Sequence, residues 1–279
     1  MEQILLGAPV AKQLDEISKN VFQKHRKENE KPHLTAITVG DNPASLLYVT
    51  RKQEKALDLG VEFNWLKLDS NTSQETLEDV ISEASESTDG LIIQLPLPIH
   101  LNPEEAINCI PHEVDVDGLT SYNLGSLFSN AYNLIPATSL AVLELLNFYN
   151  IKTEDKNIVI AGRSRLVSAP LAKILSSTSY NANVSVIHSK TTNQKLFTKE
   201  ADIFISAIGS AKMYDHTFFK NGATIIDIGI SSVDGKTYGD IDTAQIGEVI
   251  SSRAPFPGGV GPITVSALFF NLSRLIQTN

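Results

Sequence analysis

The amino-acid sequence predicts an α/β protein with two domains, and three observations support this fold class. Short apolar segments with the length of strands alternate with longer segments of helical periodicity along most of the 279 residues. Apolar strands bracketed by helices are typical of parallel sheets that are covered on both faces. The length suffices for two domains, and the content of 42% hydrophobic and 20% charged residues is ordinary for a soluble globular protein.

Seven segments have the composition of buried strands: 34–39, 61–68, 90–98, 157–162, 183–188, 202–209 and 223–230. Helical patterns occupy 41–60, a stretch from about 73, a short stretch from 102, 139–149, a stretch from about 166, 192–201, and the C-terminal segment from 262. The stretch 115–123 is the expected seam between the domains. The sequence alone leaves open whether the last helix returns to the first domain.

The ends of the first helices carry recognisable capping residues. In the segment 41–60, an N-cap is expected at 41–42 and Gly60 is expected to end the helix. For the next helix, Thr72 and Glu75 have the spacing of a capping box.

Composition excludes several classes of function. The formal net charge of −9 argues against a general nucleic-acid binder or a protein of acidic membrane surfaces. No segment approaches the ~18 uninterrupted apolar residues of a membrane span, and the N-terminus lacks the pattern of a signal peptide, so a cytoplasmic protein is expected. The single cysteine, Cys109, precludes an intramolecular disulfide and is expected to be a small buried hydrophobe.

The turn "IAGRSRLVSAP" at 160–170 joins a predicted strand to a predicted helix, which is where a dinucleotide-binding loop belongs. Only Gly162 matches the glycine fingerprint, and Ser164 and Ser168 occupy later small positions, so a generic α/β turn is the alternative. The next strand ends in "HSKT", without the carboxylate that binds the ribose of NAD. Hydroxyl groups and cations there, with Arg163 in the first turn, favour the 2′-phosphate of NADP.

Two further strands end in glycine, at Gly209 and Gly229, where a flat ligand can approach the backbone. The stretch "PFPGGVGP" at 255–262 combines three prolines with three glycines, a composition that favours a loop presenting backbone amides to a ligand. In "EVDVDG" the spacing of Asp115 and Asp117 hints at calcium, but the other ligands of such a loop are missing. We therefore expect no metal site, and either an acidic boundary loop or an aspartate that binds ring N–H groups of a ligand.

The helix after the first strand places Ser45, Tyr48 and Lys52 on one face. A solvated amphipathic face, with the lysine tip in water, is the simplest interpretation. If this face instead borders a cleft, desolvation lowers the lysine pKa and makes Lys52 a proton acceptor near neutral pH. Gln94 stands alone in an apolar strand and needs a polar partner if it is buried. Lys52 is a suitable partner for it.

In their order and spacing these motifs resemble the bifunctional methylenetetrahydrofolate dehydrogenase/methenyltetrahydrofolate cyclohydrolase family. The matching stretches cover nearly the whole chain: "VGDNPASLLYVTRK", "GLIIQLPLP", "DVDGLTSYNLGSL", "GRSRLVSAP", "HSKT", "ADIFISAIG", "IDIGI", "GD" at 239–240 and "PGGVGPIT". The resemblance implies a folate-binding catalytic domain formed by 1–118 and 257–279, a Rossmann-type NADP domain at 119–256, a cleft between them, and a homodimer. It also implies a place in one-carbon folate metabolism and purine biosynthesis.

The resemblance further assigns roles to individual residues. Catalytic roles fall on Lys52, Tyr48, Gln94 and Asp117. Substrate binding falls on Ser45, Tyr48, Asp117, Pro257, Gly258 and Gly259. Cofactor binding falls on Gly162, Arg163, Ser164, Ser189, Gly209, Ile230 and Gly261. The chain departs from the family pattern at Leu46, at Ala137, Ser139 and Leu140, where the family commonly has Cys, Pro and Gly, and at Ser168, which replaces a glycine.

The implied chemistry is NADP-dependent oxidation of 5,10-methylenetetrahydrofolate to the methenyl cation and hydrolysis of that cation to 10-formyltetrahydrofolate. Two alternatives stay open at this point. One is a two-domain dehydrogenase of amino or hydroxy acids, and the pairing of Lys52 with Gln94 argues against it. The other is a non-catalytic dinucleotide sensor, which would bind the nucleotide without reducing it.

Overall fold

The computed structural model describes residues 2–28, 31–247 and 249–278, and these form two compact units. The three-stranded unit, named after its sheet, contains residues 12–137 and the C-terminal segment from Val265. The six-stranded unit contains the N-terminal segment up to Ala11 and residues 138–264. The described part of the chain is thus a two-domain α/β protein, as the sequence predicts.

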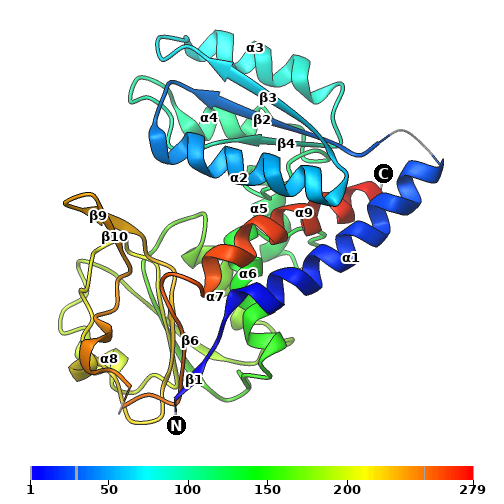
Figure 1. Ribbon diagram of the computed structural model, residues 1–279. Helices are drawn as coiled ribbons and strands as arrows, with labels where there is room; N and C mark the ends of the chain where they lie inside the picture. Colours follow the sequence, from blue (N-terminus) through cyan, green and yellow to red (C-terminus); the bar gives the residue numbers. More distant parts are fainter. Residues whose placement is uncertain (1, 29–30, 248, 279) are drawn as a thin grey trace. The chain divides into compact units, whose positions relative to one another are not determined.

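The three-stranded unit is built on a parallel sheet with the strand order β3-β2-β4. Its strands are β2 (His33–Val39), β3 (Glu62–Leu68) and β4 (Gly90–Ile93). Its helices are α2 (Pro43–Leu59), α3 (Gln74–Ser85), α4 (Pro103–Asn108), α5 (Ser121–Phe128), most of α1 (Gly7–Glu28) and the C-terminal part of α9 (Val260–Thr278). Figure 1 shows the sheet between α2 and α3, and a core cluster joins the sheet to α3 and α4.

The six-stranded unit has the strand order β1-β11-β8-β7-β5-β6, and every neighbouring pair is parallel. The strands are β1 (Gln3–Ile4), β5 (Asn157–Ala161), β6 (Asn183–Ile187), β7 (Ile203–Ser206), β8 (Thr224–Asp227) and β11 (Ser252–Ala254). The chain passes from β5 to β6 on one side, then crosses back to β7 on the other side of β5. The carboxyl ends of β5 and β7 therefore form a topological switch point, the usual ligand position in open α/β sheets.

Other elements complete the six-stranded unit: α6 (Ala137–Phe148), α7 (Ser168–Leu175), α8 (Lys195–Thr198), the 3-10 turns η1 (His216–Phe218) and η2 (Thr243–Gln245), and the hairpin β9 (Ser231–Val233) and β10 (Lys236–Tyr238). Its core cluster centres on Phe204, which contacts the rings of Tyr214 and Phe219. None of the described helices is both long enough and apolar enough to cross a membrane.

Local signals in the sequence predicted most of these elements. Asn42 caps α2 by accepting hydrogen bonds from the backbone, and Gly60 ends that helix with φ 74°. The capping box at Thr72 was wrong, because the Ser73 side chain accepts the hydrogen bond of Thr76 N instead. The burial predicted for Cys109 was also wrong. Cys109 follows α4 on the side away from the buried residues of that helix and is exposed.

The sequence analysis missed the long helix α1 and several short elements: β1, β11, α5 and the β9–β10 hairpin. The hairpin did carry a signal, because Asp234-Gly235 is a favoured hairpin turn and both residues have positive φ. The unit boundaries also differ from the expected domain limits. Residues 119–137 group with the three-stranded unit, and 257–264 group with the six-stranded unit. The C-terminal part of α9 packs in the three-stranded unit, where a Cβ at Gly90 would lie 2.8 Å from Leu272 Cδ1.

Candidate active site

Helix α2 carries Ser45, Tyr48 and Lys52 on the side that packs toward the sheet of the three-stranded unit. Ser45 is buried in line with Val49, and Tyr48 and Lys52 are half-buried beside them. Ser45 Oγ donates a hydrogen bond to Leu95 O at 3.4 Å. The solvated interpretation of this face is therefore wrong for Ser45, which is buried with Val49. Lys52 is only half-buried, and its tip contacts Gln94.

Lys52 and Gln94 meet, as the sequence predicted. Lys52 Nζ donates to Gln94 Oε1 at 3.1 Å. Gln94 is the first residue after β4, and its backbone N–H still bonds to Ile37 O at 2.9 Å. Its Nε2 donates to Leu95 O at 2.9 Å, which fixes the amide so that Oε1 faces the lysine.

Burial lowers the pKa of Lys52, although the nearby carboxylate of Asp117 acts in the opposite direction. Burial raises the pKa of Asp117; Lys52 opposes this rise and Asp115 adds to it. Desolvation thus outweighs the attraction between the two charges. Burial therefore shifts both groups toward their uncharged forms.

The loop that carries Asp117 is fixed by buried polar contacts. Asp115 Oδ2 accepts hydrogen bonds from Thr120 N at 2.8 Å and from Asn123 Nδ2 at 2.9 Å. Asn271 of α9, itself fully buried, donates to Val116 O at 3.0 Å. Asp115 therefore has a structural role, and Asp117 is the partly exposed member of this pair. Within residues 2–28, 31–247 and 249–278, no three His, Cys, Asp or Glu side chains are arranged to hold a metal ion.

The turn after β5 in the six-stranded unit lies at the switch point of its sheet and requires a glycine. Gly162 has φ 120°, and a Cβ there would lie 2.8 Å from Ala207 O and 2.9 Å from Ser168 Oγ, so only glycine fits at the switch point. Arg163 and Ser164 follow it and are exposed. The Ser164 hydroxyl also accepts the hydrogen bond of Val167 N at 3.2 Å, which shapes the turn before α7.

Two of the family departures lie directly behind this turn. Ser168 begins α7 and is buried, and its hydroxyl has no hydrogen-bond partner among the described residues. Ser139 donates to Val167 O at 3.0 Å. These two departures therefore pack against the turn, while Arg163 and Ser164 stay exposed.

Ser189 lies beyond the end of β6, the strand next to β5, and is exposed. Because β5 and β6 are parallel and Ala161 pairs with Ile187, Ser189 and Arg163 follow strand ends at the same edge of the sheet. The residue after β6 is His188, whose backbone N–H donates to Thr191 Oγ1 at 3.0 Å. The strand end thus presents hydroxyl groups and Lys190 rather than a carboxylate, a donor set that fits a 2′-phosphate.

The turns after β7 and β8 carry Gly209 and Ile230. Gly209 has φ 67° and is exposed, and the Ile230 side chain is 46% exposed. Behind them lie two buried carboxylates, Asp227 and Asp240. Sequence reasoning gave these aspartates no role. The signal that was present is an acidic residue inside the apolar stretch "TIIDIGI" and another in "GDI".

The loop 255–262 is fixed by backbone contacts within the six-stranded unit. Gly259 N donates to Pro255 O at 2.7 Å, and Gly7 N donates to Gly258 O at 2.8 Å. Gly258 has φ 105°, which favours glycine. Helix α9 begins at Val260 within the loop rather than at Pro262. Pro257 and the glycines 258, 259 and 261 are thus assembled with the nucleotide turns, and Lys52, Gln94 and Asp117 are assembled in the three-stranded unit.

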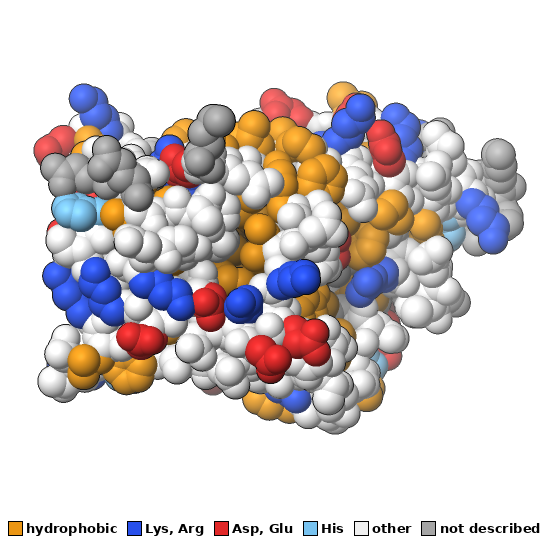
Figure 2. Space-filling model, turned by 90° about the horizontal axis from the view of Figure 1, so that it is seen from below, with side chains coloured by type: hydrophobic (Ala, Val, Ile, Leu, Met, Phe, Trp, Pro, Cys, Tyr) orange, Lys and Arg blue, Asp and Glu red, His pale blue; other side chains and the backbone are white. Residues whose placement is uncertain are grey.

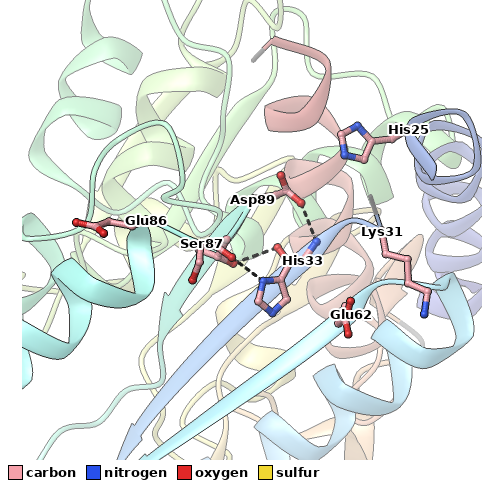
Figure 3. Close-up of a pocket in the computed structure, with 8 residues that line it drawn as sticks. His25, Lys31, His33, Glu62, Glu86, Ser87 and Asp89 are labelled. Carbon is pink, nitrogen blue, oxygen red and sulfur yellow. Dashed lines mark hydrogen bonds between the residues drawn. The ribbon is translucent and has the colours of Figure 1, made fainter. Parts of the chain in front are cut away.

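A cavity of about 600 Å³ lies elsewhere in the three-stranded unit (Figure 3). Its lining includes His33, Glu62 and Asp89, which stand at the amino-terminal starts of the three strands. Asp89 accepts a hydrogen bond from His33 N at 2.7 Å, and His33 Nδ1 contacts Ser87 O at 2.8 Å. Since Gln94 follows the opposite, carboxyl-terminal end of β4, this cavity is not part of the Lys52 site.

Surface charge does not single out a nucleic-acid face in the view of Figure 2. Lysine and arginine side chains there lie beside aspartate and glutamate side chains and form no continuous basic surface.

A parallel sheet with a glycine turn at its switch point, joined in one chain to a second α/β unit with a desolvated lysine, defines the class of two-domain dinucleotide-binding enzymes. Comparison with known proteins gives the particular family. Residues 5–117 match the model of the tetrahydrofolate dehydrogenase/cyclohydrolase catalytic domain, and residues 136–279 match that of its NAD(P)-binding domain. The chain belongs to the tetrahydrofolate dehydrogenase/cyclohydrolase family.

Similar proteins match over nearly the full chain. The bifunctional protein FolD of Streptococcus agalactiae is 38% identical over 272 residues, which cover 96% of this chain and 95% of that protein. The bifunctional enzyme FolD of Campylobacter jejuni has a crystal structure that matches with a TM-score of 0.95 at 32% identity, covering 100% of this chain and 99% of that chain. The Trypanosoma brucei enzyme, whose crystal structure contains NADP cofactor and an inhibitor, matches with a TM-score of 0.93 at 29% identity, covering 99% and 98%.

Proposed function

We propose that this chain oxidises 5,10-methylenetetrahydrofolate with NADP⁺ and then hydrolyses the methenyl product to 10-formyltetrahydrofolate. The observation that carries the proposal is the contact between Lys52 and Gln94 in a chain of this family. The contact holds a lysine of lowered pKa at a fixed place in the catalytic unit.

In the oxidation, bound NADP⁺ supplies the acceptor for the hydride that leaves the methylene carbon. The protein needs no general base for this step, so its main contribution is to orient the two rings. A charged lysine beside the forming methenyl cation would oppose the reaction. Because burial lowers the pKa of Lys52, this repulsion is reduced.

In the hydrolysis, water attacks the methenyl carbon and Lys52 accepts a proton from that water. The hydroxyl group formed on this carbon then loses its remaining proton to solvent as the bond from the carbon to one ring nitrogen breaks, and Lys52 returns the first proton to the departing nitrogen. A neutral amine can donate one N–H to Gln94 and still offer its lone pair to the water. We assign Tyr48 to the wall of the pocket and Asp117 to the pterin ring, with which a carboxyl group of raised pKa can both donate and accept hydrogen bonds.

On the nucleotide side, we assign the 2′-phosphate to Arg163, Ser164 and Ser189. All three are exposed, and Arg163 and Ser189 follow the adjacent strand ends of β5 and β6. Gly162, Gly209, Ile230 and Gly261 are assigned to the rest of the cofactor, and Pro257, Gly258 and Gly259 to the substrate side of their loop.

We further propose that the protein is a homodimer and acts in the cytoplasm. Both proposals rest on the family to which the chain belongs. Light scattering during size-exclusion chromatography tests the first, and a monomer at micromolar concentration would contradict it.

The decisive experiment follows NADPH formation from methylenetetrahydrofolate and, separately, the loss of methenyl absorbance. Lys52→Met should abolish hydrolysis and weaken the oxidation less. Lys55→Met is the matched control, because Lys55 lies on the same helix but pairs with Asp15 at 2.6 Å; it should retain both activities. Full hydrolysis by Lys52→Met would refute the role of the lysine. Binding of NADP⁺ by the unmodified protein without turnover would instead favour a non-catalytic sensor.

A further inference from the structure

The Asp240 carboxylate is fully buried and accepts hydrogen bonds on both oxygens. Ser206 Oγ and Ile208 N donate to Oδ2 at 2.7 and 2.9 Å, and Ser210 N donates to Oδ1 at 2.7 Å. The three donors come from the end of β7 and the turn that follows it. This turn contains Gly209, so its backbone is held by a carboxylate from a distant part of the chain.

The same carboxylate also lies against the turn after β8. A Cβ placed on Gly229 would overlap the Asp240 carboxylate, so a side chain at this position would push the turn away. The backbone of this turn is tied to β7 as well, since Ile228 N donates to Ser206 O at 2.8 Å. Asp240 therefore lies between the turns that carry Gly209 and Ile230.

Asp227, the last residue of β8, holds Asp240 in place. Its Oδ1 accepts from Asp240 N at 3.0 Å, and its Oδ2 accepts from Ile241 N at 3.1 Å. The two aspartates are thus linked by hydrogen bonds through the backbone at 240–241. Asp227 fixes the backbone at 240–241, and the Asp240 side chain fixes the turn after β7.

We propose that Asp240 is a positioning residue that sets the turns after β7 and β8 against the nicotinamide half of the cofactor. The proposal rests on the NADP-dependent function proposed above. In a nucleotide-binding sheet of this topology the adenosine half lies beside the first two strands, here β5 and β6, and the nicotinamide half lies across the switch point. A residue that shapes only the second pair of turns should affect the two halves of the cofactor differently.

Asparagine is an informative replacement because it keeps the size and removes one acceptor. Both oxygens of Asp240 receive backbone N–H groups, from Ile208 and from Ser210. An asparagine amide nitrogen must face one of them, so the turn after β7 loses one of its two backbone hydrogen bonds in either orientation. Asp242→Asn is the matched control, because Asp242 accepts a hydrogen bond from Ala244 N at 3.2 Å and asparagine caps a helical turn equally well.

The test measures binding by calorimetry and hydride transfer by single-turnover kinetics. The probes are NADP⁺ and adenosine 2′,5′-bisphosphate, which contains the adenosine half with its 2′-phosphate. For Asp240→Asn we expect the affinity for the bisphosphate to stay within about twofold, and hydride transfer from the folate at saturating NADP⁺ to slow about tenfold or more. Asp242→Asn should match the unmodified protein in both measurements.

Gly229→Ala provides a second variant if Asp240→Asn fails to fold, because it displaces the turn while the carboxylate stays in place. It should show the same selective loss. If bisphosphate affinity and the rate of hydride transfer fell equally, Asp240 would have only a general structural role and the proposal would be wrong. An unchanged rate of hydride transfer would also refute it. If the unmodified protein binds neither probe, the proposed cofactor is wrong, and this outcome is distinct from failure of the positioning role.

Discussion

Replacing Asp227 with asparagine should alter the free energy of unfolding by an amount that depends on pH. Asp227 is 5% exposed at the end of β8. Burial raises its pKa from 3.8 to about 6, although hydrogen bonds from backbone N–H groups oppose the rise. The folded protein therefore binds this proton more tightly than the unfolded chain. Stability from this group is greatest below pH 3.8 and is lost as the pH rises to about 6.

The magnitude follows from the difference in pKa. A shift of about two units corresponds to about 3 kcal/mol, of which about 2 kcal/mol falls between pH ~4.5 and pH ~8. Asparagine does not titrate, and the cost of its missing acceptor is the same at every pH. The stability of the natural protein relative to Asp227→Asn should therefore fall by about 2 kcal/mol over this interval.

Urea unfolding followed by circular dichroism, at several pH values and constant ionic strength, measures this difference. Carbon-13 NMR of the aspartate carboxyl groups should also show a midpoint near the pKa of about 6. Asp202→Asn is a control with the opposite sign. Burial acts to raise the pKa of Asp202, but hydrogen bonds from Lys220 and from Asn157 N lower it overall. A difference for Asp227→Asn that is constant with pH, or that grows in favour of the natural protein, would refute the reasoning.

Three other predictions concern activity and reactivity. The rate of methenyl hydrolysis should fall as the pH is lowered through the pKa of Lys52, because the protonated amine cannot accept a proton. If the pH–rate profile instead had its midpoint at the ordinary lysine value of 10.5, Lys52 would not be a desolvated amine. Ser189→Asp should lower the ratio of kcat/KM for NADP⁺ to kcat/KM for NAD⁺ by about tenfold or more, because a carboxylate would repel the 2′-phosphate. Steady-state kinetics with both cofactors measures this ratio, and an unchanged ratio would mean that Ser189 does not contact the 2′-phosphate. Partial burial and the charges of Glu78 and Glu105 raise the pKa of Cys109, so at neutral pH its thiol should react with iodoacetamide more slowly than free cysteine does, as mass spectrometry can follow.

The sequence by itself determined the local elements and the residue types of the site. Asn42 and Gly60 mark the ends of α2 because capping depends on neighbours a few residues away. The apolar strands and the turn at Gly162 are equally local; they predicted a parallel sheet and left a nucleotide loop and a generic turn as alternatives. The spacing of Ser45, Tyr48 and Lys52 likewise showed that they share one helical face.

Only the tertiary structure decided which of these residues meet and how each is charged. The chain between Lys52 and Gln94 contains the end of α2, then β3, α3 and β4, and the amide rotamer that directs Oε1 to the lysine is set by Leu95 O. The raised pKa of Asp117 depends on what is packed around it. The hydrogen bond from Asp240 N to Asp227 Oδ1 joins the end of β8 to a loop 13 residues further along the chain. Desolvation and long-range hydrogen bonding depend on the whole packed environment of a group, and a local pattern along the chain does not contain that environment.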